Sequence, residues 1–224
     1  MIEFLSNADT EVFLFFNSMH TAYLDRFMMM FTGRFVWVPM YAALLYTILR
    51  NCPPRRALVT ALCVILAIAV SDQFCGHLLR PAVARLRPAN LDNPLSALAV
   101  IVNDYRGGTY GFPSCHAANS FALATFCSLF LRTRRAAIFI LVWAILNSYS
   151  RLYLGVHYPG DLFVGAAFGA IFGALCYYLS RIIPPTPVYT DAQLAGPFRT
   201  SDLMMLVGCA TAAFIALYAI FPSD

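Results

Sequence analysis

A histidine and an aspartate stand in a spacing that suits nucleophilic chemistry, in the run Ser150-Arg151, then His157, then Asp161. Pro159 interrupts any continuous helix, so we expect His157 in a turn and Asp161 in the first turn of the next helix. A carboxylate there can accept the imidazole N–H, which fixes the tautomer and makes the other ring nitrogen a better nucleophile or base. The alternative is that Asp161 is only a negative charge favoured at a helix N-terminus.

A second group of polar residues, Pro113-Ser114-Cys115-His116, stands directly before an apolar run. Pro113 fits the first turn of a helix, where the next backbone N–H groups have no partner, so this helix end is suited to bind an anion. Ser114 adds a hydroxyl donor, and His116 can carry a proton near neutral pH. The alternative is that His116 only makes a structural hydrogen bond.

Arginines form the third group, because Arg80, Arg85 and Arg87 fall within eight residues. A guanidinium is suited to forked hydrogen bonds with phosphate oxygens. The alternative is a face that meets solvent or lipid headgroups. All 15 basic residues of the chain are arginine, a bias that favours planar contacts to phosphate or carboxylate.

Together these residues predict phosphoryl transfer without a metal. Arginines and backbone amides would surround the equatorial phosphate oxygens, with a nucleophile on one side and a proton donor to the leaving oxygen on the other. No cluster of His, Cys, Asp and Glu has metal-ligand spacing, and the seven cysteines indicate neither a disulfide framework nor a zinc site. We therefore expect no cofactor.

The composition indicates that lipid is the solvent for much of the chain. Of the 224 residues, 60% are hydrophobic and 12% are charged, and the mean hydropathy is +0.69. So few charges cannot cover a water-soluble surface, and the same figures exclude intrinsic disorder, a coiled coil and a secreted mini-protein. Nucleic acid is not expected as a partner, because the arginines are dispersed between apolar runs. The acidic N-terminal residues argue against a cleaved signal peptide.

We expect an all-α, polytopic membrane helix bundle of about six spans. The candidate segments are residues 34–49, 57–79, 113–131, 136–153, 161–183 and 203–221. The first is short unless it extends back through residues 27–31. Residues 1–26 are apolar but interrupted by polar side chains, which predicts an interfacial amphipathic helix; a seventh span is the weaker interpretation. The expected division is therefore an interfacial segment at 1–26 and a six-span domain at 27–224, with the catalytic motifs within 80–161.

Arginine in short loops predicts the orientation of the bundle. Arginines gather between spans one and two, three and four, and five and six, at Arg50, Arg55, Arg56, Arg132, Arg134, Arg135, Arg181 and Arg199. These loops should face the cytoplasm. The loops at 80–112 and 150–160 then face outside, together with both termini, so all three polar groups share one outer face. The apolar loop 90–111 is expected to line a lipid entrance there, with Tyr105 and Arg106 at the headgroup.

A stripe of small residues recurs every four positions in the segment 161–183, at Gly165, Gly169 and Gly173. Such a stripe gives one face of a helix a groove that lets a neighbouring helix approach closely. We interpret it as a packing face.

The three polar groups resemble the signature of the type 2 phosphatidic-acid phosphatase family, which are membrane lipid phosphatases related to the vanadium haloperoxidases. The family pattern is a lysine, six residues and Arg-Pro; then Pro-Ser-Gly-His; then Ser-Arg, five residues, His, three residues and Asp. Here it appears as Arg80 with Arg87-Pro88, as Pro113-Ser114-Cys115-His116, and as Ser150-Arg151 with His157 and Asp161. The resemblance covers residues 57–183. Arg80 departs from the lysine and Cys115 from the glycine.

The resemblance implies that His157 attacks phosphorus to give a phosphohistidine and that Asp161 orients it. His116 would protonate the leaving alkoxide and then activate the water that hydrolyses the intermediate. The groups implied to hold the phosphate are Arg80, Arg87, Ser114, the backbone amide near Cys115, and Arg151, while Arg85 and Ser150 have weaker claims. Cysteine at position 115 would be strained if that backbone position needs a positive φ.

The resemblance also implies a lipid phosphate monoester or diphosphate as substrate. The candidates are a phosphate of lipid A, undecaprenyl diphosphate and phosphatidylglycerol phosphate, in a bacterial inner membrane with the site facing the periplasm. The alternative is a lipid or anion transporter or binding protein that uses the same basic site without hydrolysis. Most ionisable groups lie at span ends, whereas transporter sites usually lie near the midplane. The oligomeric state is left open.

Overall fold

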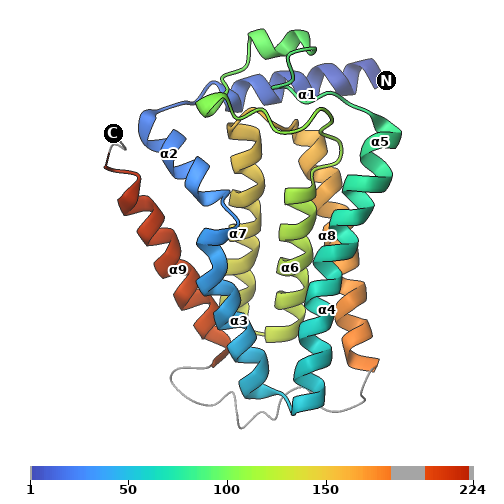
Figure 1. Cartoon of the computed structure of the whole chain (residues 1–224), viewed down its shortest axis with the longest axis vertical. Helices are drawn as coiled ribbons and strands as arrows, with labels where there is room; N and C mark the ends of the chain where they lie inside the picture. Colours follow the sequence, from blue (N-terminus) through green and yellow to red (C-terminus); the bar gives the residue numbers. More distant parts are fainter. Residues whose placement is uncertain (1, 183–199, 222–224) are drawn as a thin grey trace.

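The computed structural model describes residues 2–182 and 200–221 and is helical throughout. Figure 1 shows a bundle of upright helices with one helix, α1 (Ile2–Asn17), lying across one end. Within the described residues there is no strand, and a single isolated bridge joins Leu86 to Tyr110 in the loop region. The prediction of an all-α bundle is confirmed.

The upright helices follow the expected apolar segments in order. They are α2 (Ala22–Phe31), α3 (Val38–Asn51), α4 (Pro54–Gln73), α6 (Cys115–Leu131), α7 (Arg134–Tyr153), α8 (Pro159–Ile182) and α9 (Thr200–Tyr218). The helix α4 continues through a π-helical turn, η2 (Phe74–Leu79), into the short α5 (Arg80–Val83). Prolines at the first positions of α4 and α8 start these helices where a missing N–H costs nothing.

Three of these helices are long and apolar enough to cross a membrane, namely Pro54–Val83, Arg134–Tyr153 and Pro159–Ile182. The pair Ala22–Phe31 and Phe35–Asn51 would give a fourth span, bent by 69°. The helices Cys115–Leu131 and Asp202–Tyr218 are apolar but shorter. The expected count of six is compatible with this arrangement. Residues 27–31 belong to α2, so the first segment extends back through them where the bent pair is one span. Residue 183 and Arg199, used in the sequence predictions, lie outside the described residues.

The N-terminal helix α1 packs on the protein itself. Its Phe13 is fully buried in a cluster with Leu152 and Tyr158, and the amide of Asn17 donates to the carbonyl of Tyr153 at 3.0 Å. The segment expected as one amphipathic helix over 1–26 is instead two helices, because α1 ends at Asn17 and Thr21 caps the start of α2. Part of the apolar face of α1 therefore covers the bundle.

The glycine stripe of α8 packs against α6, as its spacing predicts. A Cβ atom at Gly165, Gly169 or Gly173 would collide with backbone carbonyls of α6 and its N-cap at successive turns, those of Ser114, Ala118 and Ala122. The residues of α6 that face the stripe are themselves small and buried. Because the two backbones touch, the N-termini of α6 and α8 are held side by side.

A bulky side chain in the stripe should force these helices apart. We expect Gly169→Leu to lower the free energy of unfolding by about 3 kcal/mol, since the new side chain would meet the backbone of α6. Thermal unfolding of the detergent-purified protein measures this loss. The matched control is Ala167→Leu on the exposed face of the same helix; equal stabilities for the two variants would contradict the packing role.

Candidate active site

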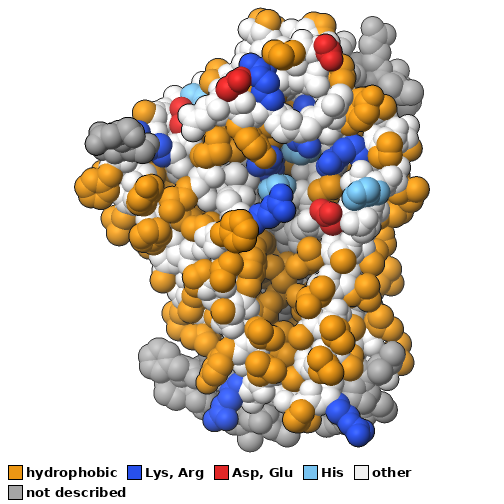
Figure 2. Space-filling view, in the orientation of Figure 1, with side chains coloured by type: hydrophobic (Ala, Val, Ile, Leu, Met, Phe, Trp, Pro, Cys, Tyr) orange, Lys and Arg blue, Asp and Glu red, His pale blue; other side chains and the backbone are white. Residues whose placement is uncertain are grey.

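The three polar groups meet at the end of the bundle that carries α1. A cavity of about 600 Å³ lies there. Figure 2 shows arginine and histidine side chains around a hollow in the upper half of one face, above a belt of hydrophobic side chains. The predicted site residues that line the cavity are Arg80, Arg87, Cys115, His116, Arg151 and His157.

The turn between α7 and α8 holds His157 against Asp161. The Asp161 side chain is fully buried, and its Oδ2 lies 3.2 Å from Nδ1 of His157 and accepts the backbone N–H of Tyr158 at 3.1 Å. An Nδ1–H donated to this carboxylate leaves the lone pair on Nε2. That nitrogen faces NH1 of Arg87 at 2.9 Å. The imidazole is therefore oriented on both of its nitrogens, as nucleophilic chemistry requires.

The surroundings of His157 disfavour its protonation. Burial is the largest cause that lowers its pKa well below the ordinary histidine value, and the positive charges of Arg87, Arg151 and Arg80 lower it further. Burial lowers the pKa of Arg87 to about 10, together with the positive charges of Arg80 and Arg151. At neutral pH the imidazole is thus neutral, with an unprotonated lone pair on Nε2 that faces the positively charged Arg87.

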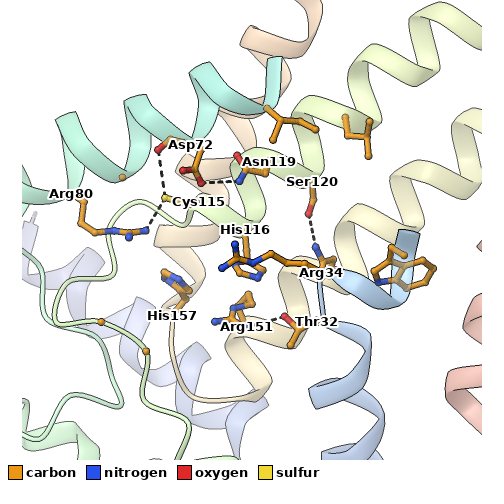
Figure 3. A pocket seen from close by; sticks show the side chains of 18 of the residues that line it. Thr32, Arg34, Asp72, Arg80, Cys115, His116, Asn119, Ser120, Arg151 and His157 are labelled. Atoms are coloured by element: carbon orange, nitrogen blue, oxygen red, sulfur yellow. Dashed lines mark hydrogen bonds between the residues drawn. The ribbon is translucent and has the colours of Figure 1, made fainter. Parts of the chain in front are cut away.

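The arginines of the first motif are held by backbone oxygens of the loops. Arg87 is buried and donates to the carbonyl of Tyr110 at 3.1 Å and to that of Val156 at 3.0 Å. Arg80 donates to the carbonyl of Pro113 at 3.1 Å and to Sγ of Cys115 at 3.0 Å (Figure 3). These bonds leave other guanidinium N–H groups unused, among them the buried Nε of Arg80.

Arg151 enters the cavity from the end of α7. It is buried and donates to the hydroxyl of Thr32 at 3.0 Å and to that of Tyr105 at 3.1 Å, while its Nε has no partner among the described residues. The guanidinium of Arg151 is the charge that lowers the pKa of Tyr105, against the effect of burial. Two buried Nε donors, on Arg80 and Arg151, are therefore available to an anion.

The helix start at the second motif differs from the prediction in register. The helix α6 begins at Cys115, with Ser114 as its N-cap accepting the N–H of Ala117 at 3.4 Å. Pro113 precedes the cap, because a serine side chain can accept an N–H and a proline side chain cannot. Ser114 is buried in this cap and does not line the cavity, whereas His116, in the first turn of α6, does.

The arginine with the weaker claim, Arg85, contacts Asp161 instead of lining the cavity. Its NH1 lies 3.1 Å from Oδ1 of Asp161 and 2.7 Å from a carboxylate oxygen of Asp9 on α1. Its Cζ lies 3.7 Å from the ring centroid of Tyr158. The other oxygen of Asp9 accepts the N–H of Gly160 at 2.7 Å. Helix α1 is therefore bonded to the start of α8, beside the His157–Asp161 pair.

The chain is similar to several known proteins. The model of the PAP2 superfamily matches residues 58–183. The chain belongs to the PAP2 superfamily. It is 48% identical to the lipid A 4'-phosphatase of Bacteroides thetaiotaomicron, over all of both chains, and 31% identical to that of Porphyromonas gingivalis, over 92% of this chain and 90% of the relative. Its similarity to these phosphatases makes it an integral-membrane lipid phosphatase, a hydrolase of phosphate esters.

Two solved structures of the superfamily have a similar fold. The crystal structure of LpxE from Aquifex aeolicus has a TM-score of 0.55 and 26% identity, and covers 75% of this chain and 93% of that one. The PAP2 type phosphatidylglycerolphosphate phosphatase from Bacillus subtilis has a TM-score of 0.61 at 18% identity, over 82% of this chain and 89% of that one. The second likeness concerns the fold alone.

The departures from the PAP2 pattern are accommodated locally. Cys115 is the first residue of an α-helix and is not among the non-glycine residues with positive φ. The backbone strain considered from the sequence for a cysteine at this position is therefore absent. Its thiol packs against Gly76, where an added Cβ would lie 3.2 Å from Sγ, and accepts a hydrogen bond from Arg80. The arginine and the cysteine that replace the usual lysine and glycine are thus in contact.

The loop 90–111 contributes Tyr105, Gly107 and Gly108 to the lining of the cavity, whereas its apolar stretch does not line it. The lipid entrance expected along this loop stays a prediction. Leu95 and Ala99 pack against the cluster around Phe13 of α1, so this stretch covers the end of the bundle. Arg106 donates to Asp104 and to a backbone carbonyl and is not a cavity residue, whereas Tyr105 is one. Packing near α1 thus accounts for Leu95 and Ala99, whereas Leu91, Leu98 and Val100 of the same loop are exposed.

Several residues of the site escape sequence reasoning. Gly111 passes directly over the pair, since a Cβ there would lie 3.0 Å from Oδ2 of Asp161 and 3.2 Å from Cγ of Arg87. Asp9 and Arg34 come from parts of the chain far from the motifs, so no local spacing points to them. Of these three residues, only Gly111 could have been found from local sequence, because it stands directly before Phe112-Pro113 of the second motif.

The contact between Asp9 and Arg85 should stabilise the end of the bundle. We expect Asp9→Ala to lower the free energy of unfolding by about 1–2 kcal/mol, because Gly160 loses its N–H acceptor and Arg85 loses a carboxylate. Thermal unfolding in detergent measures the change. Glu11→Ala, on the exposed side of the same helix, is the control, and a loss of the same size there would argue against a specific contact.

The neutral His157 should make the protein less stable in acid. Its pKa is lowered in the folded state, so below about pH 6.5 the unfolded chain binds a proton that the folded protein does not. The contribution of His157 to the free energy of unfolding is fully present above that pH. It falls by up to about 1.4 kcal/mol for each pH unit below it. We expect the unfolding temperature to fall more steeply from pH 7 to 5 in the unaltered protein than in His157→Gln. Parallel curves would contradict a neutral buried imidazole.

Proposed function

We propose that this protein removes a phosphate from a lipid A type glycolipid through a phosphohistidine on His157. The observation that carries the chemistry is the buried His157–Asp161 pair, with its free Nε2 turned to Arg87. The substrate class is supported by the relatives in Bacteroides thetaiotaomicron and Porphyromonas gingivalis, both named lipid A 4'-phosphatase, and by the full coverage of the first.

In the first step Nε2 of His157 attacks phosphorus, and the bond from phosphorus to the headgroup oxygen breaks. Arg87 lies 2.9 Å from Nε2, so the incoming phosphoryl group takes over this guanidinium as a partner of its equatorial oxygens. Arg80 and Arg151 contribute their unused N–H groups to the same oxygens. Asp161 stabilises the positive charge that develops on the imidazole, as a carboxylate on Nδ1–H does.

His116 handles the protons of both steps. It takes up a proton together with the negatively charged phosphate and donates this proton to the leaving alkoxide, which departs as an alcohol. The neutral imidazole then accepts a proton from the water that attacks the phosphohistidine. The bond from nitrogen to phosphorus breaks in this second step, which releases inorganic phosphate and restores both histidines. The amide end of α6 at Cys115 supplies further donors, while Ser114 acts by capping that helix.

We also propose that the site faces the periplasm across a bacterial inner membrane. The starts of α4 and α7 lie at the other end of the bundle from α1, and they carry Arg55, Arg56, Arg134 and Arg135. Figure 2 shows basic side chains at that lower end. Short loops rich in arginine favour the cytoplasm. Residues 27–224 form the phosphatase bundle in this proposal, with α1 bound over its outer end.

The test is the release of inorganic phosphate by the detergent-purified protein from a panel of lipids, in the presence of a chelator. The panel holds lipid A, phosphatidylglycerol phosphate, undecaprenyl diphosphate and phosphatidic acid. We expect release from lipid A to survive chelation and to fall at least about a thousandfold in His157→Ala, as the loss of a nucleophile does. His20→Ala is the control, because His20 bonds Asp25 outside the cavity.

Two outcomes would count against the proposal in different ways. Release that stops on chelation or persists in His157→Ala would overturn the phosphohistidine mechanism. Preference for undecaprenyl diphosphate over lipid A would overturn the substrate assignment and leave the mechanism in place.

A further inference from the structure

The cavity continues past the phosphate-binding groups into the bundle, along a set of polar side chains that belong to none of the three motifs. We call this set the inner polar wall, and its members are Arg34, Asn119, Ser120, Trp143 and Asn147. Asn119 follows His116 by about one helical turn on α6, and Asn147 precedes Arg151 by four residues on α7. The wall therefore begins about one turn, or roughly 6 Å, deeper than the arginines.

Buried atoms of the inner polar wall have unmet hydrogen-bonding capacity. Asn147 is 8% exposed and donates to the hydroxyl of Ser120 at 2.6 Å, but its Oδ1 has no partner among the described residues. Asn119 donates to Asp72 at 2.9 Å, and its Oδ1 likewise has none. The indole N–H of Trp143, which is 4% exposed, is also unpaired in the described part of the chain.

Such atoms are rare in folded proteins, because an unpaired buried polar group costs free energy. Of the buried side-chain atoms that lack a partner in the described residues, five belong to residues that line this one cavity. These are Nε of Arg80 and Arg151, Oδ1 of Asn119 and Asn147, and Nε1 of Trp143. Their concentration in one place indicates a ligand that offers both O–H donors and oxygen acceptors.

The guanidinium of Arg34 completes the wall. It lies at the junction between α2 and η1 (Phe35–Trp37), lines the cavity and is exposed, and it makes no ion pair or hydrogen bond with the described residues. Figure 3 shows it reaching toward His116 from the side opposite His157. The wall thus presents acceptors on two amides and donors on an indole and a guanidinium.

The position of the wall relative to the two histidines assigns it to the leaving group, an argument that rests on the proposed function. In Figure 3 His116 lies between His157 and the pair Arg34 and Ser120. In-line displacement places the leaving oxygen on the far side of phosphorus from the nucleophile. The alcohol that His116 protonates therefore lies against the inner polar wall.

We propose that the inner polar wall binds the hydroxyl groups of the sugar that carries the phosphate, together with the carbonyls of the acyl groups attached to that sugar. A sugar ring offers several O–H donors and oxygen acceptors within a few ångströms, which matches amide oxygens beside an indole N–H and a guanidinium. A hydrocarbon alcohol such as a polyprenol would leave the same buried atoms unpaired. A site built to bond hydroxyls rejects an analogue that lacks them far more strongly than an apolar pocket rejects an added methylene. The wall thus selects phosphorylated glycolipids.

Two variants test this assignment through specificity. In Asn147→Leu and in Arg34→Gln we expect KM for a synthetic N-acylated glucosamine 4-phosphate lipid to rise about tenfold, the usual effect of losing one or two hydrogen bonds. The value of kcat/KM for phosphatidic acid with the same acyl chains should stay within about twofold, because its glycerol headgroup does not use the wall. Asn7→Leu, at an exposed position of α1, is the control. Arg34 is exposed, so its variant does not depend on repacking the core.

Binding gives a second readout that does not require turnover. Both tryptophans of the chain, Trp37 and Trp143, line the cavity. We expect the dephosphorylated glucosamine lipid to change their fluorescence in His157→Ala. In the double variants that add Asn147→Leu or Arg34→Gln, the dissociation constant read from this change should be about tenfold higher.

The two readouts separate this proposal from the proposed function. Equal effects of the wall variants on both lipids, or no effect on either, would overturn the sugar assignment. A fluorescence response without phosphate release from any lipid would sink the phosphatase mechanism and keep the wall as a sugar-binding site.

Discussion

The carboxylate of Asp161, buried where α6, α8 and the motif loops converge, is the group on which the rest of the site depends. Its oxygens bond the imidazole of His157, the backbone of the turn and the guanidinium of Arg85. Its own backbone carbonyl accepts the N–H of Ser114 at 3.0 Å, which ties the start of α8 to the start of α6. One residue therefore fixes the tautomer of one histidine and the position of the helix that carries the other.

That convergence is possible because α6 and α8 approach to backbone contact along the glycine stripe. Side chains in the stripe would hold the helix starts apart, and the carbonyl of Asp161 would then be too far from Ser114. Packing in the apolar part of the bundle and hydrogen bonding at its polar end thus depend on the same geometry. In a bilayer this matters more than in water, because lipid offers no hydrophobic driving force between helices and close packing must supply the attraction.

The sequence predicts the features that follow from local spacing. Apolar runs give the helices in order, the glycine repeat gives a packing face, and the motifs give six residues that line one cavity. Contacts between distant segments lie beyond such reasoning. Asp9 meets Arg85 only because α1 folds back over the bundle, and the start of α6 shifts from Pro113 to Cys115 because Ser114 can accept an N–H. Arg34 likewise stands in no motif, and only the bend between α2 and α3 brings it to the cavity.

The salt bridge between Asp9 and Arg85 changes what counts as the minimal enzyme. By sequence, residues 1–26 are an interfacial amphipathic segment in front of a separate phosphatase domain at 27–224. In the structure α1 supplies a carboxylate to the same guanidinium that touches Asp161, and it covers Tyr158 with Phe13. In a truncated protein that starts at α2, the polar end of the bundle would be exposed to water on the side that α1 covers. Deletion studies on this chain therefore report on the reaction centre as well as on membrane attachment.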